Sequence, residues 1–291
     1  MPEQMVGIFQ RVAPGVFVLL WSTGFIGAKL GLPDAEPLTF LLLRFAIVCA
    51  LLLALVLALR RPWPVDRRQV LHIAVAGVLL HGGYLGGVFG AIHHGMAAGP
   101  VALIVGMQPL LTALLGGRLL GERVAARQWV GLLLGFVGVL LVLSGKLAMA
   151  GASVAGLALA LLALLSITAG TLYQKRFCGQ MELWTGSLIQ FAATGLIFLP
   201  LALTLETMQV NWSGNFVFAL GWLVLVLSLG AISLLHLLIR RGAATRVSTL
   251  FYLTPPATAV MAWAIFGEQL DLPALAGMAL AAAGVALALK R

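Results

Sequence analysis

Charged residues are scarce in this sequence. Asp, Glu, Lys and Arg together make up 9% of its 291 residues, whereas hydrophobic residues make up 62%. A soluble domain carries about 25% charged residues, because polar side chains must cover its water-facing surface. This shortage excludes an ordinary soluble protein and indicates an integral membrane protein.

Acidic residues are the scarcer kind, with 9 Asp and Glu against 18 Lys and Arg, which gives a net charge of +9. A basic chain can bind nucleic acid, but here the basic residues occupy short segments between apolar runs and form no patch, so we expect no nucleic-acid partner. No Asp or Glu lies within a long apolar run. A proton-driven exporter of organic cations usually needs such a carboxylate, so the sequence argues against that class.

Motifs for enzymatic chemistry are missing as well. The sequence contains no Gly-rich loop with the Lys that binds ATP, and no Ser, His and Asp arrangement suited to hydrolysis. His93 and His94 lack the cysteine or carboxylate neighbours of a metal site. The two cysteines, Cys49 in an apolar run and Cys178 in a basic segment, are not expected to form a disulfide. We therefore expect no enzyme activity, no cofactor and no metal.

The apolar runs are continuous and do not alternate with polar residues as the strands of a membrane β-barrel do. Each run approaches the length of about 20 residues that a helix needs to cross a bilayer. The first run follows Glu3 and Arg11 without a small-residue cleavage site, so we interpret it as an uncleaved span. The sequence therefore predicts an all-α membrane protein. Its ten transmembrane helices are predicted at residues 12–30, 38–59, 70–92, 99–119, 127–145, 153–174, 184–205, 214–239, 244–266 and 272–289.

The distribution of Lys and Arg predicts the orientation of these spans. Alternate loops, together with both termini, contain nearly all of them: Arg11, Arg60, Arg61, Arg67, Arg68, Arg118, Arg123, Arg127, Lys175, Arg176, Arg240, Arg241, Arg246, Lys290 and Arg291. The remaining loops contain only two basic residues, Lys29 and Lys146, and they also contain the acidic residues Asp34, Glu36, Glu206, Glu268 and Asp271. Because cytoplasmic loops are rich in Lys and Arg, we expect both termini in the cytoplasm.

Several residues recur at one constant spacing. The following residues are matched 146 positions later: Pro109 by Pro255, Gly121 by Gly267, Glu122 by Glu268, Gly131 by Gly277, Gly138 by Gly284, Lys29 by Lys175, Glu36 by Glu182, Thr39 by Thr185 and Phe45 by Phe191. Chance similarity between Leu-rich and Ala-rich helices is the alternative, but it does not explain matched Pro, Glu and Lys. We therefore predict two repeats, residues 1–146 and 147–291.

Each repeat would contain five spans, an odd number, so the second repeat would lie upside down relative to the first. Loop charge supports this arrangement. The segment around Glu122 contains three arginines, whereas its counterpart around Glu268 contains none of them and adds Asp271. Inverted repeats around a central cavity are the architecture that exposes one site alternately to the two sides of a membrane.

Prolines interrupt corresponding spans of the two repeats, Pro109 in the fourth span and Pro255 and Pro256 in the ninth. Proline removes a helix hydrogen bond and clashes with the preceding turn. Matched interruptions often mark a transporter's binding site, although a kink that serves packing alone is equally compatible with the sequence.

The third span is rich in glycine. Gly82, Gly86 and Gly90 lie four residues apart on one face, which lets another helix approach closely. Packing within the chain is the favoured interpretation, and a homodimer contact is the alternative. His81 and Tyr84 share a face of the same span, and His81 would either line a cavity or be a satisfied core histidine.

Arg44 is the one clear charge within a predicted span, about 9 Å by helix rise from its end. It would either snorkel outward or pair with Asp34 or Glu36, or it would instead bind a carboxylate.

Ten spans in two halves, with these motifs, resemble the drug/metabolite transporter superfamily and in particular its EamA-type proteins. The segments that support the resemblance are Trp21–Gly24, Pro37–Phe45, Pro109–Glu122 and Pro255–Glu268. The family implies inverted five-helix repeats around a central cavity, walled by spans 1, 3, 4, 6, 8 and 9, with spans 5 and 10 at the periphery. The chain is most similar to the branch of bacterial amino-acid exporters, which implies the inner membrane. It departs from the pattern at Gln190 and Ile167, which replace Arg and Trp at the positions matching Arg44 and Trp21.

We therefore expect a secondary transporter that exports small neutral metabolites, above all amino acids including aromatic ones, by alternating access and as a monomer. The residues predicted to line the substrate site are Trp21, His81, Tyr84, Gln108, Thr168, His236 and Tyr252. Aromatic rings would enclose the substrate side chain, and His, Gln and Thr would bind its polar ends. The alternatives are a drug or organic-cation exporter, a membrane enzyme and a receptor-like binding protein.

Overall fold

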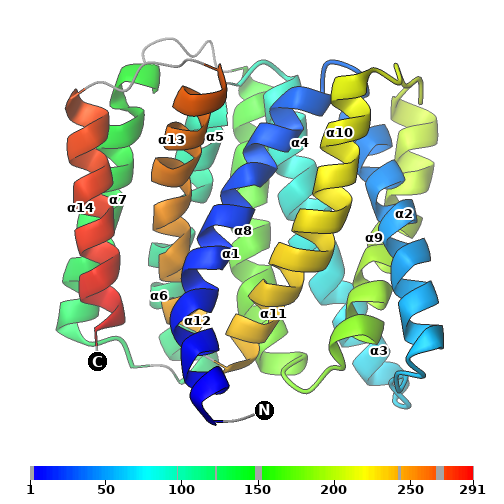
Figure 1. Ribbon diagram of the computed structural model, residues 1–291, viewed down its shortest axis with the longest axis horizontal. Helices are drawn as coiled ribbons and strands as arrows, with labels where there is room; N and C mark the ends of the chain where they lie inside the picture. Colours follow the sequence, from blue (N-terminus) through cyan, green and yellow to red (C-terminus); the bar gives the residue numbers. More distant parts are fainter. Residues whose placement is uncertain are drawn as a thin grey trace.

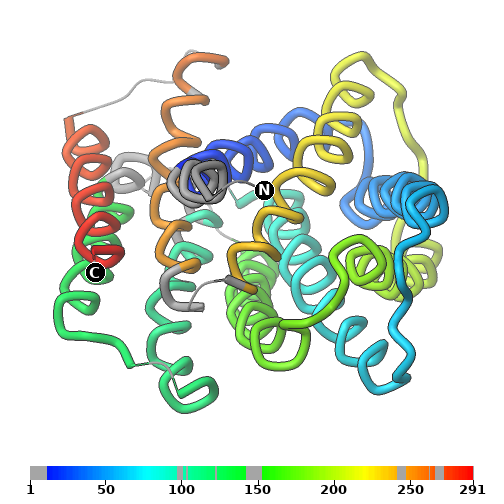
Figure 2. The backbone as a smooth tube through the Cα atoms, turned by 60° about the horizontal axis from the view of Figure 1, so that its bottom comes forward, coloured from blue at the N-terminus to red at the C-terminus, as the bar shows by residue number. Residues whose placement is uncertain are grey.

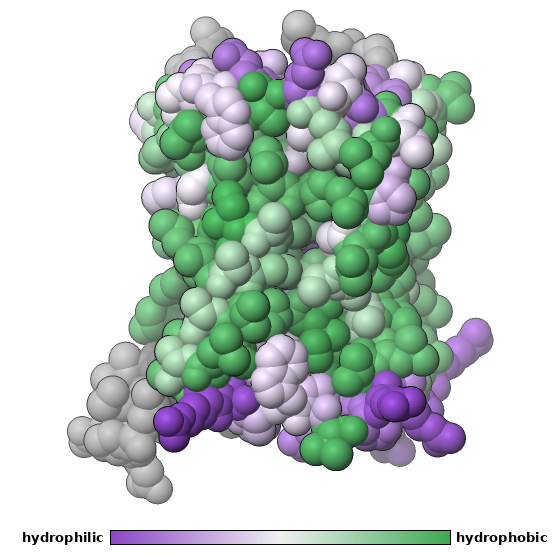
Figure 3. All heavy atoms as spheres, turned by 90° about the vertical axis from the view of Figure 1, so that its right-hand side faces the viewer, coloured by the Kyte–Doolittle hydropathy of each residue, from purple (hydrophilic) through white to green (hydrophobic). Residues whose placement is uncertain are grey.

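The computed structural model describes residues 3–96, 98–121, 123–147, 153–241, 244–266 and 272–290. Helices account for almost all of them, and the only extended pairing among the described residues is an isolated antiparallel bridge between Ala35 and Val210. Figure 3 shows an apolar belt of side chains between two ends at which polar side chains gather. The predicted all-α membrane fold is confirmed. Glu122 and residues 267–271, which contributed to the repeat and to the orientation, lie outside the described residues.

The helices stand side by side, and the first and last of them reach the same end of the bundle, the lower end in Figure 1. Their bounds are α1 Glu3–Gly31, α2 Pro37–Ala58, α3 Arg67–Gly77, η1 Val78–Gly86, α4 Gly87–His93, α5 Ala98–Val105, α6 Gln108–Leu120, α7 Ala126–Leu147, α8 Val154–Phe177, α9 Leu183–Leu205, α10 Gly214–Trp222, η2 Leu223–Ala231, α11 Ile232–Arg241, α12 Ala244–Thr249, η3 Leu250–Leu253, α13 Thr254–Phe266 and α14 Leu272–Leu289.

Seven helical stretches of the described chain are long and apolar enough to cross a membrane. They are Val12–Gly31, Pro37–Ala58, Arg67–His93, Val154–Phe177, Leu183–Leu205, Gly214–Arg240 and Leu272–Leu289. Ala126–Leu141 is a shorter apolar helix. The remaining predicted spans, 99–119 and 244–266, coincide with helices that are interrupted at their middle.

Helix irregularities occur at corresponding places in the two halves. The third and eighth predicted spans each contain nine residues of π-helix, η1 and η2. The fourth breaks between α5 and α6, just before Pro109, and the ninth passes through the 3-10 helix η3 just before Pro255. The prolines stand in the first turn of the helix that follows, where a missing N–H costs little. Irregular turns of this kind leave backbone groups free and often occur at functional sites.

α7 and α14 lie side by side at one edge of the bundle (Figures 1 and 2), and glycines form the seam between them. A Cβ added to Gly131 would lie 2.6 Å from the carbonyl oxygen of Gly284, and one added to Gly138 would lie 2.7 Å from that of Gly277. The two helices are therefore in backbone contact and run antiparallel. Small residues permit such close approach between membrane helices.

The glycines of the third span are covered within the chain. A Cβ on Gly87 would meet the carbonyl oxygen of Leu159 in α8 at 2.6 Å, whereas one on Gly86 would meet the ring of Phe198 in α9 at 3.0 Å. The glycine face thus packs between two helices of the second half.

Carboxylates cap helix ends at both sides of the bundle. Glu206 accepts hydrogen bonds from the backbone N–H groups of Leu38 and Thr39 at 2.7 Å each, and so satisfies the first turn of α2. Glu182 does the same for Trp184 and Thr185 in the first turn of α9, at 2.8 Å each. Such caps satisfy donors that a helix start leaves unpaired.

Two further carboxylates tie the α1–α2 loop to the α9–α10 loop. Asp34 accepts hydrogen bonds from Asn211 Nδ2 and Ser213 Oγ, at 2.7 and 2.6 Å. Glu36 accepts from the backbone N–H and the hydroxyl of Thr207, at 2.7 and 2.6 Å. The Thr207 hydroxyl lowers the pKa of the Glu36 carboxyl, because its hydrogen bond favours the ionised form.

Candidate functional site

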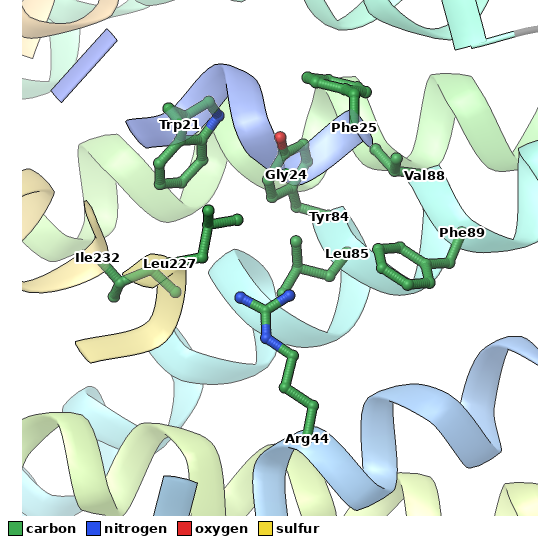
Figure 4. Close-up of a pocket in the computed structure, with 10 residues that line it drawn as sticks. All are labelled: Trp21, Gly24, Phe25, Arg44, Tyr84, Leu85, Val88, Phe89, Leu227 and Ile232. Atoms are coloured by element: carbon green, nitrogen blue, oxygen red, sulfur yellow. The ribbon is translucent and has the colours of Figure 1, made fainter. Parts of the chain in front are cut away.

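A small buried cavity lies between the two halves of the chain, with a volume of about 30 Å³ (Figure 4). Its lining comes from α1, α2, η1, α4, η2 and α11, as Trp21, Gly24, Phe25, Arg44, Tyr84, Leu85, Val88, Phe89, Leu227 and Ile232. A second cavity of about 10 Å³ shares Trp21, Phe25 and Tyr84 and adds residues beside the breaks of the fourth and ninth spans: Ala102, Val105, Gly106, Phe251, Thr254 and Pro255. One water occupies roughly 10–15 Å³ on this measure, so neither cavity has space for a metabolite, and we call this arrangement the closed form.

Aromatic rings separate the two cavities. The rings of Trp21 and Tyr84 are stacked, with centroids 6.1 Å apart and an interplanar angle of 11°. Phe251 meets the Trp21 ring edge-on at 5.3 Å, and Phe17 lies 5.2 Å from the same ring. These rings offer a flat apolar surface of the kind that holds aromatic or aliphatic ligands.

Arg44 is the charged group of the larger cavity. It is 1% exposed, and its Nε donates a hydrogen bond to Ser228 Oγ at 2.9 Å. Nη1 and Nη2 have no hydrogen-bond partner among the described residues. Figure 4 shows the guanidinium extending from α2 toward Leu85 and Leu227 at the cavity wall. Pairing with Asp34 or Glu36, one of the two interpretations of Arg44, is therefore wrong, because those carboxylates are bonded to the α9–α10 loop.

His81 and His236 belong to a polar cluster beside the aromatic cavity. The His81 ring is stacked on Phe191 at 4.2 Å, and its Nε2 lies 3.3 Å from Gln190 Oε1. His236 Nδ1 lies 3.4 Å from Ser187 Oγ, and the two histidine rings are 6.4 Å apart. The second nitrogen of each ring has no hydrogen-bond partner among the described residues: Nδ1 of His81 and Nε2 of His236. Neither histidine lines the cavities, although His81 lies one turn from Tyr84.

Gln108, Thr168 and Tyr252 are fully or almost fully buried but point elsewhere. Gln108 donates hydrogen bonds to the hydroxyls of Thr171 and Ser248, at 3.3 and 3.2 Å. The hydroxyl of Thr168 bonds the carbonyl oxygen of Leu164 in its own helix at 2.7 Å.

Tyr252 packs against Gly135 of α7, and its neighbour Phe251 is the residue of η3 that reaches the cavity. The sequence singled out Tyr252 as an aromatic residue in the middle of the ninth predicted span, and nothing in it favoured the neighbouring Phe251 for the cavity.

Comparison with known proteins agrees with this arrangement. The sequence model of the EamA-like transporter family matches residues 16–144 and again residues 154–290. The chain belongs to the EamA-like transporter family. The family predicted from the motifs is thus confirmed, and the protein is a multi-pass membrane transporter.

Relatives of this EamA-family protein include uncharacterised transporters and probable amino-acid metabolite efflux pumps. It is 26% identical over 253 residues to the uncharacterized inner membrane transporter YedA of Escherichia coli K12, covering 87% of this chain and 81% of the relative. It is 25% identical over 278 residues to a probable amino-acid metabolite efflux pump of Salmonella typhimurium LT2, covering 92% and 90%. A solved crystal structure with 22% identity superposes with a TM-score of 0.78 over 96% of this chain and 95% of its own, which is a likeness of fold.

Proposed function

We propose that this EamA-family protein is a secondary transporter that exports small neutral metabolites, above all amino acids including aromatic ones, by alternating access. The observation that carries the proposal is the buried aromatic cavity, which lies where corresponding helices of both halves are irregular. Discontinuous helices with a site between two repeats are typical of alternating-access carriers. The name of the Salmonella relative, a probable amino-acid metabolite efflux pump, supports the substrate class.

The proposal includes ten spans in two inverted repeats, residues 1–146 and 147–291. The glycine seam supports it. Gly277 and Gly284 follow Gly131 and Gly138 by 146 residues, yet Gly131 contacts Gly284 and Gly138 contacts Gly277. A twofold axis produces this exchange. If residue i of one half contacts the counterpart of residue j in the other half, then residue j contacts the counterpart of residue i.

A residue that lies on a twofold axis contacts the corresponding residue of the other half. Phe45 and Phe191, which are 146 residues apart, have ring centroids 5.5 Å apart between α2 and α9. The axis would therefore pass near these rings, at the opposite edge of the bundle from α7 and α14 (Figure 1).

In this proposal Trp21 and Tyr84 enclose the apolar part of the substrate, since both form the wall shared by the two cavities. His81 and His236 would line the path once the helices separate. The hydrogen bonds of Gln108 and Thr168 to neighbouring hydroxyl and carbonyl groups favour structural roles in the closed form, as does the packing of Tyr252 on Gly135. Because the cavity holds about two waters, binding must be coupled to movement of the halves.

We further propose that the protein lies in the bacterial inner membrane as a monomer with both termini in the cytoplasm. The Lys and Arg distribution supports the orientation. Coverage of the third-span glycines within the chain supports a carrier that works alone.

Counterflow tests the proposed function. Purified protein in proteoliposomes preloaded with an unlabelled amino acid is expected to accumulate the same labelled amino acid. Empty liposomes serve as the control, and an organic cation such as tetraphenylphosphonium is expected not to exchange. Absence of flux for every amino acid of a full panel would contradict the proposal, and exchange of the organic cation alone would favour the drug-exporter alternative.

A further inference from the structure

We propose that Arg44, held by Ser228, is the subsite that binds the carboxylate of the transported substrate. The inference rests on the proposed transport function and goes beyond it, because it defines which chemical group the site requires. The substrate class becomes carboxylates with an apolar side chain, and the amino group becomes dispensable.

The Arg44 guanidinium is buried with most of its hydrogen-bond donors unsatisfied. Arg44 is 1% exposed, and only Nε has a partner, Ser228 Oγ at 2.9 Å. The two terminal nitrogens are buried without partners among the described residues. Arginine stays charged in proteins, and a charge within a membrane is costly unless it is paired or functional. A buried guanidinium with two donors that no side chain satisfies is suited to binding an anion.

The surrounding charges are the second argument. The predicted spans contain no Asp or Glu. The carboxylates nearest to the start of α2 are engaged elsewhere: Asp34 and Glu36 bond the α9–α10 loop, and Glu206 bonds the first turn of α2. Within the described part of the chain, therefore, no carboxylate neutralises Arg44, and the field in the cavity attracts an anion and repels an organic cation.

The geometry of the cavity is the third argument. Arg44 and the stacked pair Trp21 and Tyr84 line one cavity (Figure 4). The free terminal nitrogens form the planar fork that binds a carboxylate through two parallel hydrogen bonds. A carboxylate on this fork places the rest of a small molecule against the aromatic rings. The lining has no acidic group for an ammonium, so the amino group of an amino acid adds little to recognition.

The arginine of the subsite has no counterpart in the second half of the chain. Gln190 occupies the position 146 residues after Arg44, and its neutral amide is bonded to Gln174 Oε1 at 2.8 Å and to His81. A single anion site per molecule follows, so the carrier would take one carboxylate in each cycle. This asymmetry also suggests the test substitution, because Arg44→Gln gives the first half the neutral residue of the second.

The test compares four ligands that share one ring. Labelled phenylalanine counterflow is competed by phenylalanine, 3-phenylpropionate, phenethylamine and 2-phenylethanol, which carry both groups, the carboxylate alone, the amine alone and neither. We expect the two carboxylates to compete within about tenfold of each other and the amine and alcohol to be at least about 30-fold weaker, as for loss of one partner of a buried charge pair. Equal competition by the amine or alcohol would overturn the carboxylate subsite while leaving amino-acid transport intact.

Variants connect the preference to Arg44. Arg44→Gln is expected to remove the advantage of the carboxylates, and Arg44→Lys to retain part of it, because a point charge replaces the fork. Arg67→Gln, a loss of an exposed charge at the start of α3, is the matched control and is expected to keep the preference of the unaltered protein. An unchanged preference in Arg44→Gln would refute the assignment.

A binding measurement separates this inference from the transport proposal. Thermal unfolding in detergent is expected to shift upward with 3-phenylpropionate for the unaltered protein and not for Arg44→Gln or Arg44→Met, each compared with its own ligand-free midpoint. A shift without any flux would contradict the transport proposal and support the subsite. Replacement of chloride by isethionate, a sulfonate without a carboxylate, is expected to leave the ligand preference unchanged, and a preference that vanishes without chloride would assign Arg44 to an inorganic anion and overturn the proposal.

Discussion

Single residues decide the chemistry of the cavity, and they are where the two halves differ most. At a spacing of 146 residues, Ile167 corresponds to Trp21 and Gln190 corresponds to Arg44. The apolar runs indicated Trp21 and Tyr84 because large aromatic residues at mid-span stand out from Leu and Ala. The direction of Arg44 depends on Ser228 and on loops more than 160 residues away in the sequence, so spacing alone could not choose between its two interpretations.

Trp21→Ala is expected to weaken apparent affinity for aromatic amino acids about tenfold or more, because the stacked partner of Tyr84 and the wall of both cavities are lost. Trp21→Phe should retain most of the affinity. The measurement is half-saturation in counterflow, with folding checked by gel filtration, since truncation of a buried Trp costs about 3–5 kcal/mol. Trp63→Ala, at a half-exposed ring, is the control, and an equal loss in that variant would argue against a role for Trp21 in binding.

Helices and loops provide the scaffold, and most of them were predictable. Continuous apolar runs located the seven long apolar helices to within a few residues, because a helix in lipid must be apolar over its whole length. Pro109 and Pro255 indicated the breaks of two spans. The π-helical turns of η1 and η2 were not predicted, since no proline is present in either and η2 reads as an ordinary apolar helix. The 3-10 turns of η3 also changed which face meets the cavity, which exchanged Tyr252 for Phe251.

Gly138→Ala is expected to destabilise the protein by about 1–3 kcal/mol, because the new methyl group would overlap the backbone of Gly277 and Ala281. Thermal unfolding in detergent measures the effect as a lower midpoint. Gly195→Ala in α9 is the control, since nothing lies within 4 Å of its added Cβ. A midpoint for Gly138→Ala equal to that of the control would show that the seam tolerates separation of α7 and α14.

The tie between the α1–α2 and α9–α10 loops should be sensitive to acid. The pKa of Glu36 is lowered by its hydrogen bond to Thr207, so the stabilisation is fully present above the unfolded value of 4.5 and is lost as the pH falls through the lower, folded value. Glu36→Gln is therefore expected to lower the unfolding midpoint at pH 7, with the difference from the unaltered protein shrinking below about pH 4.5. A difference that stays constant from pH 7 to pH 3 would contradict this assignment.

The whole molecule is a helical membrane bundle, and its loop charges predict which end faces the cytoplasm. The family and the helical membrane fold were predictable from the sequence, because composition and spaced motifs report on both. The two inverted repeats remain a prediction with structural support. The closed form, with room for about two waters, could not be foreseen, because cavity size depends on side-chain packing between distant spans.

Orientation is tested by two cysteines in a background in which Cys49 and Cys178 are replaced by serine. Val65→Cys lies in the α2–α3 segment at a side chain that is 99% exposed, and Gln209→Cys lies in the exposed α9–α10 loop. With cytoplasmic termini, a membrane-impermeant maleimide added to intact cells should label Gln209→Cys and label Val65→Cys only after lysis. The reverse pattern would place the termini outside.

The glycine seam between α7 and α14 is self-complementary, because the two helices contact each other through glycines at corresponding positions. An isolated first half could cover its own seam only with a second copy inserted in the opposite direction. In the proposed inverted repeat, one polypeptide supplies both directions and no dual insertion is needed. A chain cut between residues 147 and 153 should accordingly give two unlike fragments that reassemble with each other, rather than two that pair with themselves.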